Sequence, residues 1–307
     1  MEPEKGQLQC LLNRVPSAGA SVPRFPRFRG SKVLWFQGPK LRPAIIPSGG
    51  IAITARYVRG MPNQSWQPDR SDILDILREA RVEEEALLAA GSNYVFLLKM
   101  DHATAGEGYT VYKPQRGEAP LHDFPSGTLY KREYAAYLVS EALGWHLVPP
   151  TIIREEGLEL GLGVLQLFVV HDPARHFFNL RDGREDEMKR IAVFDWLCNN
   201  ADRKGGHCLL DANGRMWCID HGIAFHSEDK LRTVIWDYQD LPVPDNLIED
   251  VRHFAGMLQQ DTEIHAQLAE LLLPHEMSRL IERAAEIEQR RAFPTPPPYR
   301  PYPWPMI

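Results

Sequence analysis

Two aspartates lie in the arrangement that phosphoryl transfer needs. Asp202 begins the stretch Asp-Arg-Lys-Gly-Gly-His, and Asp220 follows eighteen residues later in Asp-His-Gly. In phosphoryl transfer one carboxylate orients the acceptor hydroxyl and takes its proton, and a second holds a divalent metal ion against the nucleotide phosphates. Kinase folds place the first on a loop, with a further metal ligand five residues on, and the second in an Asp-x-Gly after the next hairpin. Asp202 is therefore the candidate base, and Asp220 and His207 are the candidate metal ligands.

A lysine and a glutamate upstream complete this pattern. Lys113 lies at the end of an expected strand, where its ammonium group can reach phosphates, and Glu133 lies twenty residues later on the following helix, where it can pair with Lys113. Gly91, Ser92 and Asn93 open the preceding strand, and their backbone amides with the Ser92 hydroxyl can cradle a phosphate. Each motif alone is common, but their order along the chain favours a nucleotide-dependent kinase.

The elements that must position these residues follow from the hydrophobic pattern. We expect strands over 94–99, 109–113 and 158–170, and helices over 126–143 and 184–198. Two short strands, 208–210 and 216–219, flank an Asn-Gly turn at Asn213, which is a strong hairpin signal. From 246 to 291 the pattern is helical throughout. Strands and one helix therefore precede a mainly helical half, and the chemical residues gather where the two meet.

These motifs resemble those of a known superfamily. Asn200-Ala-Asp-Arg203 and Ile219-Asp-His-Gly-Ile-Ala-Phe225 resemble the catalytic and metal-binding motifs of the phosphatidylinositol 3-/4-kinase-like superfamily, especially type II phosphatidylinositol 4-kinases and the HipA-like and Fam20-like atypical kinases. The block from about 86 to 285 also resembles a bacterial phosphatidylinositol kinase-like family, through Tyr112-Lys-Pro-x-Arg-Gly-Glu118, Asp123-Phe-Pro-x-Gly127 and Thr128-Leu-Tyr-x-Arg-Glu133. The resemblance implies an α+β, bilobal atypical protein-kinase-like fold, with a small β-rich N-lobe over 70–170 and a mainly helical C-lobe over 171–292.

The resemblance also implies the role of each residue. ATP would lie between the lobes with Mg²⁺ or Mn²⁺. Lys113 would bind the α- and β-phosphates, Glu133 would orient Lys113, and Ser92 and Asn93 would lie over the phosphates. The segment that holds Gln166, Phe168 and Val169 falls where the hinge between the lobes is expected, so its backbone would meet the adenine. Arg203 and Lys204 would add positive charge near the acceptor or the γ-phosphate.

One residue departs from the superfamily pattern. Relatives with known activity carry Asn where this chain has His207. Mg²⁺ prefers oxygen ligands, and an imidazole nitrogen is a softer donor. Three interpretations stay open: His207 ligates Mn²⁺ or a similar metal, it leaves the metal to Asp220 and water, or catalysis is weak or lost.

Other candidates in this region have simpler interpretations. Asp195 lies inside the expected helix 184–198, and we expect it to hydrogen-bond the catalytic loop rather than to react. Cys198, Cys208 and Cys218 lack the Cys-x-x-Cys spacing of zinc sites, so we expect buried thiols.

Composition and the two ends of the chain bound the function further. The 307 residues carry a net charge of −6, which gives no reason to expect nucleic-acid binding. Residues 1–65 are expected to be a flexible extension, since the first sixty hold ten basic residues and seven prolines, and 293–307, with seven prolines, a solvated tail. No apolar run reaches the ~20 residues of a membrane span, no secretory signal is visible, and four cysteines indicate a reducing, cytoplasmic location.

The sequence therefore predicts an ATP-dependent phosphotransferase that moves the γ-phosphate to a hydroxyl. The acceptor stays open among lipid, protein and small molecule, and the oligomeric state is unknown. A nucleotide-binding pseudokinase with a regulatory role and an AMP transferase on the same fold are the alternatives.

Overall fold

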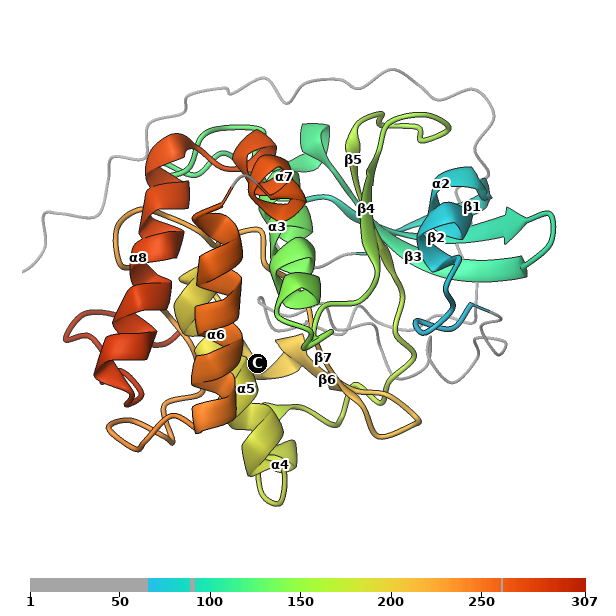
Figure 1. Cartoon of the computed structure of the whole chain (residues 1–307). Helices are drawn as coiled ribbons and strands as arrows, with labels where there is room; N and C mark the ends of the chain where they lie inside the picture. Colours follow the sequence, from blue (N-terminus) through green and yellow to red (C-terminus); the bar gives the residue numbers. More distant parts are fainter. Residues whose placement is uncertain (1–65, 89–91, 261) are drawn as a thin grey trace, which may run out of the picture. The chain divides into compact units, whose positions relative to one another are not determined.

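The computed structural model describes residues 66–88, 92–260 and 262–307 (Figure 1). The basic segment 1–65, predicted to be a flexible extension, lies outside the described residues, and so does Gly91 of the predicted phosphate-binding turn.

A five-stranded antiparallel sheet forms the first half. Its strands are β1 (Arg81–Leu88), β2 (Val95–His102), β3 (Gly106–Pro114), β4 (Thr151–Arg154) and β5 (Gly163–Leu167). They are ordered β1-β2-β3-β5-β4. Helix α2 (Ile73–Glu79) buries Ile73, Ile76 and Leu77 in the same apolar cluster as Leu98 and Leu165 of the sheet. The sheet thereby gains a core of its own, separate from that of the helices.

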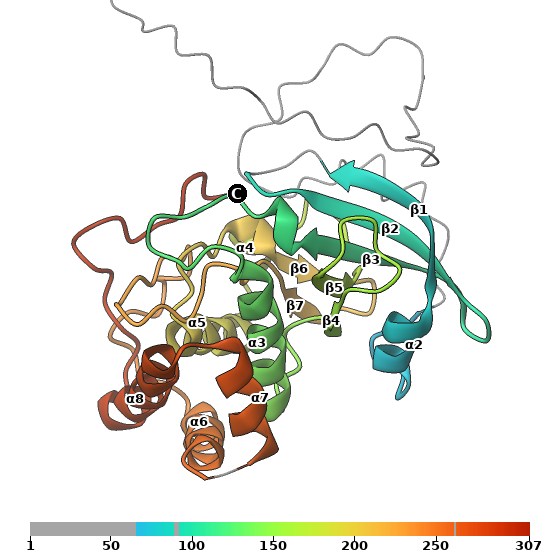
Figure 2. The same ribbon diagram turned by 90° about the horizontal axis from the view of Figure 1, so that it is seen from above.

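The second half is mainly helical. Its helices are α4 (Phe177–Leu180), α5 (Glu185–Cys198), α6 (Asp245–Leu258), α7 (Glu263–Leu271) and α8 (Pro274–Arg290). Helix α3 (Leu129–Ala142) follows the short 3₁₀ turn η1 (Gln115–Gly117) and stands between the sheet and helices α6 and α7 (Figures 1 and 2). A hairpin of β6 (Cys208–Leu210) and β7 (Met216–Cys218) follows the 3₁₀ turn η2 (Gly205–His207). The predicted α+β class, with a small sheet half and a mainly helical half, is confirmed.

Strands β1 and β4 were not expected. The stretch 246–291, predicted to be helical, forms three successive helices. Thr262 caps α7 by accepting a hydrogen bond from the His265 backbone N–H, and Pro274 begins α8. β5 ends at Leu167, close to the boundary predicted between residues 170 and 171, which stays a prediction.

The proline-rich tail 293–307, predicted to be solvated, is exposed at most of its residues but contacts the helical half at a few points. Phe293 is buried and its ring lies 5.6 Å from that of Tyr238. The Pro301 carbonyl accepts hydrogen bonds from the Thr233 N–H and the Trp236 indole. The Met306 carbonyl accepts one, at 2.7 Å, from the N–H of Gly205. The tail therefore runs along the loops beside Asp202.

Among the helices of the described residues, none is both long and apolar enough to cross a membrane.

Candidate active site

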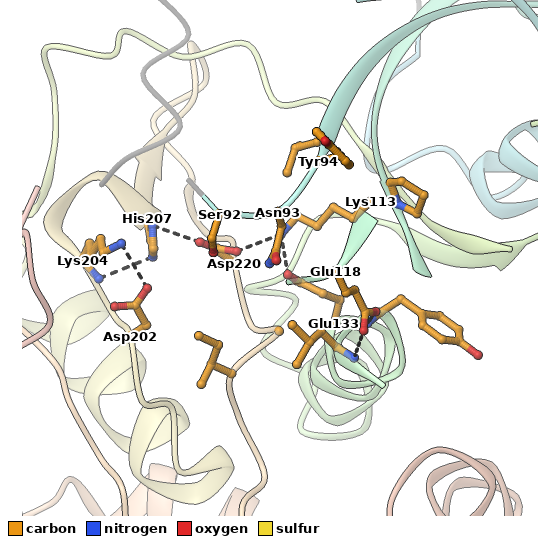
Figure 3. A pocket seen from close by; sticks show the side chains of 16 residues that line it. Ser92, Asn93, Tyr94, Lys113, Glu118, Glu133, Asp202, Lys204, His207 and Asp220 are labelled. Carbon is orange, nitrogen blue, oxygen red and sulfur yellow. Dashed lines mark hydrogen bonds and ion pairs between the residues drawn. The ribbon is translucent and has the colours of Figure 1, made fainter. Parts of the chain in front are cut away.

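Lys113 lies where the sheet faces the helical half. Strand geometry sends neighbouring side chains to opposite faces. Tyr112 is therefore fully buried in the sheet core, whereas Lys113 extends the other way toward α3. Its ammonium group contacts Glu133 Oε1 and lies 3.0 Å from Asp220 Oδ1 (Figure 3). The predicted Lys113–Glu133 pair is present, and the same lysine also reaches the aspartate of the Asp-His-Gly motif.

These contacts shift the pKa values of the charged partners. Burial by itself would lower the pKa of Lys113, but the carboxylates of Asp220 and Glu133 outweigh it and raise the pKa above its ordinary value. Burial would likewise raise the pKa of Asp220, but Lys113 holds it well below its usual range. At neutral pH the site therefore holds an ammonium group against an ionised carboxylate.

Helix α3 is held so that Glu133 faces the cleft. The Glu118 carboxylate accepts the backbone N–H groups of Leu129 and Tyr130, at 3.1 and 2.8 Å, at the start of the helix. Such a carboxylate satisfies two N–H groups that have no partner inside the helix. In addition, Glu133 Oε2 accepts the backbone N–H of His221 at 3.0 Å. Glu118 was quoted above only as part of a motif, and its role in capping α3 was missed.

A buried ion pair organises the loop that carries Asp202. Arg203 and Asp195 are both fully buried, and the Arg203 Nη2 lies 2.9 Å from Asp195 Oδ1. Asp195 also accepts the side-chain amide of Asn200 at 3.0 Å, so the prediction that Asp195 hydrogen-bonds this loop is confirmed.

Arg203, predicted to add positive charge near the acceptor or the γ-phosphate, does not face the cleft. Its guanidinium donates to the Ile219 carbonyl at 2.8 Å and contacts His221 Nε2 at 2.7 Å. Arg203 therefore joins the loop of Asp202 to the two neighbours of Asp220, and no part of its side chain is exposed.

Asp202 and Lys204 lie at the other side of the cleft. Lys204 Nζ is 3.1 Å from Asp202 Oδ2, and the two side chains are 11% and 25% exposed. Burial raises the pKa of Asp202 to about 6, although Lys204 opposes this shift. A carboxylate with a pKa near the working pH is suited to accept a proton.

His207 and Asp220 are in direct contact. His207 Nε2 lies 3.2 Å from Asp220 Oδ2, and the imidazole is 2% exposed. Burial lowers the pKa of His207 to about 3, so the ring is neutral at physiological pH. Asp220 has a φ of 65°, a left-handed conformation that is uncommon for a residue other than glycine and that often marks a functional site.

Two cavities meet at Lys113. The larger has a volume of about 130 Å³, and Glu118, Tyr130 and Lys204 line it. It is also lined by the residues predicted for catalysis, phosphate binding and metal binding, which are Ser92, Asn93, Lys113, Glu133, Asp202, His207 and Asp220. The smaller, about 30 Å³, is lined by Gln166, Phe168, Val169 and His171, and by Lys113. Apart from Arg203 and Gly91, the predicted site residues therefore line two cavities that share Lys113, and His171 is a lining residue that the sequence did not single out.

The described residues do not form a complete metal site by themselves. In the part of the chain that the structure describes, no group of three or more His, Cys, Asp or Glu side chains is placed to hold a metal ion. Mg²⁺ is commonly bound by one or two carboxylates together with substrate phosphates. The donor set thus fits a metal ion that binds together with a nucleotide. Cys198, Cys208 and Cys218 are free and buried, as predicted.

Comparisons with solved structures give similarities at low sequence identity. The Golgi casein kinase is 15% identical at a TM-score of 0.43, with 71% of this chain and 74% of that chain covered. The structure of hydra Fam20 with sugar is 13% identical at a TM-score of 0.45, covering 78% and 94%. The Helicobacter pylori proinflammatory kinase CtkA is 11% identical at a TM-score of 0.42, covering 70% and 96%.

Sequence comparison gives a nearer relative. No family model matches the chain. The phosphatidylinositol 4-kinase gamma 4 of Arabidopsis thaliana is 29% identical over 131 residues, which cover 35% of this chain and 23% of that protein, so membership in a phosphatidylinositol kinase family stays a prediction. Protein Rv2133c of Mycobacterium tuberculosis is 35% identical over 275 residues, which cover 78% of this chain and 96% of that protein. On this match, the chain belongs to the family of protein Rv2133c.

Proposed function

We propose that this protein is an ATP-dependent phosphotransferase that moves the γ-phosphate of ATP to a hydroxyl group. The observation that carries the proposal is the position of Lys113, whose ammonium group contacts Glu133 and Asp220 in the same cavity that Asp202 lines. Phosphoryl transfer depends on positioning and on charge stabilisation around the phosphates, and these are the groups that supply both.

Each residue has a role in this proposal. Lys113 moves from Asp220 to the α- and β-phosphates when the nucleotide binds, and Glu133 keeps it oriented. Asp202 orients the acceptor hydroxyl and takes its proton. Ser92 and Asn93 line the cavity on the side of the phosphates. A Mg²⁺ or Mn²⁺ ion held by Asp220 would neutralise charge on the phosphates.

The smaller cavity is the proposed place for the adenine ring. Its apolar lining includes Val111, Phe168, Leu209 and Ile219, which would contact both faces of a flat ring. Because Lys113 lines both cavities, a nucleotide with its base in the smaller one would direct its phosphates toward Asp220.

The direct test is ATP consumption by the full chain and by Asp202→Asn, with Mg²⁺ or Mn²⁺ present. We expect turnover that falls about 10²- to 10⁴-fold in the variant, as for loss of a general base. A thermal-shift titration with ATP checks that the variant still binds nucleotide. ATP binding without turnover in either protein would instead indicate a nucleotide-binding regulatory module.

The chemical product distinguishes transfer of phosphate from transfer of AMP. Mass spectrometry of the modified acceptor distinguishes an added phosphate from an added AMP, and release of ADP rather than pyrophosphate identifies the same outcome. A lipid extract, a protein extract and a panel of small alcohols, each offered with labelled ATP, test the three classes of acceptor.

A further inference from the structure

We propose that His207 is a positioning residue that carries its ring proton on Nε2, donates it in a hydrogen bond to Asp220, and does not itself bind the metal ion. The inference about the metal rests on the proposed function, whereas the inference about the ring proton does not.

The Nδ1 atom of His207 is an acceptor. The backbone N–H of Lys204 donates to it at 3.4 Å. A backbone amide always donates, so the partner nitrogen must present a lone pair and carries no proton. This contact spans the short turn η2, since Lys204 is the residue that caps its start and His207 is its last residue.

The Nε2 atom of His207 is a donor. It lies 3.2 Å from Asp220 Oδ2, while the Lys113 ammonium group lies 3.0 Å from Oδ1 of the same carboxylate. An ionised carboxylate only accepts hydrogen bonds. The two ends of the ring thus require the same tautomer independently.

The surroundings do not allow the ring to exchange its partners easily. His207 is 1% exposed, and its carbonyl accepts the Ile219 N–H at 3.1 Å and the Arg203 guanidinium at 3.4 Å. To bind a metal through Nε2, the ring would have to move its proton to Nδ1, which would then face the Lys204 N–H in a buried place. That arrangement would put two donors against each other.

The consequence concerns Asp220. Its Oδ2 is held by His207 and its Oδ1 by Lys113. When Lys113 moves to the phosphates, Oδ1 becomes available to a metal ion, while His207 keeps the carboxylate oriented. His207, which stands where relatives with known activity carry Asn, thus donates a hydrogen bond to the metal-binding Asp220 and does not bind the metal ion itself.

The first experiment measures the ring nitrogens directly. The full chain, labelled with ¹⁵N-histidine and free of nucleotide, is examined by long-range ¹H–¹⁵N correlation, and the His207 signal is identified by its loss in His207→Gln. We expect a protonated Nε2 and an unprotonated Nδ1. The opposite tautomer, or a ring protonated at both nitrogens at pH 7, would overturn the proposal whatever the enzyme does.

The second experiment examines the metal. Pulsed electron paramagnetic resonance of Mn²⁺ with ADP and the ¹⁵N-histidine protein detects any nitrogen bonded to the ion. We expect no such coupling, and a coupling that disappears in His207→Gln overturns the proposal. If Mn²⁺ and ADP do not bind at all, the proposed function fails, and the tautomer is still decided by the first experiment.

A pair of variants tests the positioning role. His207→Gln keeps an N–H donor of similar reach, whereas His207→Leu removes the donor. We expect kcat to fall about tenfold or more in His207→Leu and to be largely restored in His207→Gln, since a lost hydrogen bond to a charged group is of that size. Equal losses in the two variants, with unchanged thermal midpoints, would contradict the role.

Discussion

At the scale of single residues, Lys113 competes with any metal ion for Asp220. Its ammonium group occupies Asp220 Oδ1, which is the oxygen that we propose for the metal ion. A cation at this distance repels a second cation. The nucleotide-free protein should therefore bind divalent metal weakly.

This leads to a prediction with an unusual sign. Replacement Lys113→Met should raise the affinity of the nucleotide-free protein for Mn²⁺, by about tenfold or more, because the competing ammonium group is gone. The same variant should lose ATP turnover. Free Mn²⁺, counted by its electron paramagnetic resonance signal, measures the affinity. An unchanged or lower affinity for Mn²⁺ would show that the metal ion does not bind at Asp220.

Asp202 gives a prediction about pH. Burial places its pKa near 6, and it acts as a base only when ionised. For the free enzyme, kcat/KM should therefore rise about tenfold per pH unit below pH 6 and become level above it. Initial rates between pH 4.5 and 8, at acceptor concentrations well below KM, measure the profile. Asp202→Asn should abolish the step near pH 6, and a step that persists in this variant belongs to another group.

The residue types and their order along the chain were enough to predict which charged side chains meet around Lys113. They were not enough to assign Arg203. An arginine next to the candidate base looks like a substrate contact, and only the three-dimensional structure reveals that Asp195 pairs with it in the interior. The capping role of Glu118 was missed for the same reason, since it depends on where α3 begins.

At the scale of elements, helix α3 links the two halves. Glu133 faces the cleft, while the preceding residue, Arg132, pairs with Glu276 of α8 at 2.6 Å with both side chains buried. Arg132 also donates to the Ala224 carbonyl, in the segment that follows the Asp-His-Gly motif. The orientation of Glu133 therefore depends on a contact with the helical half.

We expect Glu276→Ala to lower the free energy of unfolding by about 3–5 kcal/mol, because the change leaves the buried Arg132 charge without its partner. Urea unfolding measures this. Glu288→Ala is the matched control. Glu288 also lies on α8, but its ion pair with Arg252 is exposed, so its loss should change the free energy of unfolding little. If the two variants lost similar amounts of unfolding free energy, the buried pair of Arg132 and Glu276 would have no special role in stability.

The strands that the sequence did not predict are the two edge strands, β1 and β4. β1 has three consecutive glutamates at Glu83–Glu85 and mostly exposed or half-buried positions, so it has no clear alternation of apolar residues. Charged edge strands are common because they discourage pairing with other molecules. β4 has only four residues and follows two prolines, which is too short for a periodic signal. The central strands and the long helices could be predicted, because their apolar residues recur with the spacing of a strand or a helix.

At the scale of the whole described molecule, the tail couples the far end of the chain to the cleft. A Cβ atom on Gly205 would lie 3.0 Å from the Phe178 ring and 3.4 Å from the Met306 carbonyl. The loop after Lys204 is therefore packed between α4 and the tail. The prolines predicted that the tail is extended. Its contacts with Gly205, Thr233 and Trp236 could not be predicted, because these residues are far from the tail in the sequence.

Ending the chain at Arg300 should loosen this loop. The Gly205, Thr233 and Trp236 N–H groups would lose their acceptors, so we expect faster hydrogen exchange over 203–206 and a fall in kcat of about tenfold or more from misplacement of Asp202 and Lys204. Hydrogen-exchange mass spectrometry measures the first effect. Trp304→Ala, which removes a side chain that is 86% exposed, should leave exchange unchanged. Exchange that is unaffected by the truncation would show that the tail is not needed by the loop.

The lysine of β3 has one further consequence for how the sheet and the helical half are held. It joins a strand of the sheet to the Asp-His-Gly loop across the cleft. If ATP binds as proposed, we expect its phosphates to replace Asp220 as the partner of Lys113 without a large hinge motion. X-ray scattering curves of the free and ATP-loaded protein should accordingly be nearly superimposable.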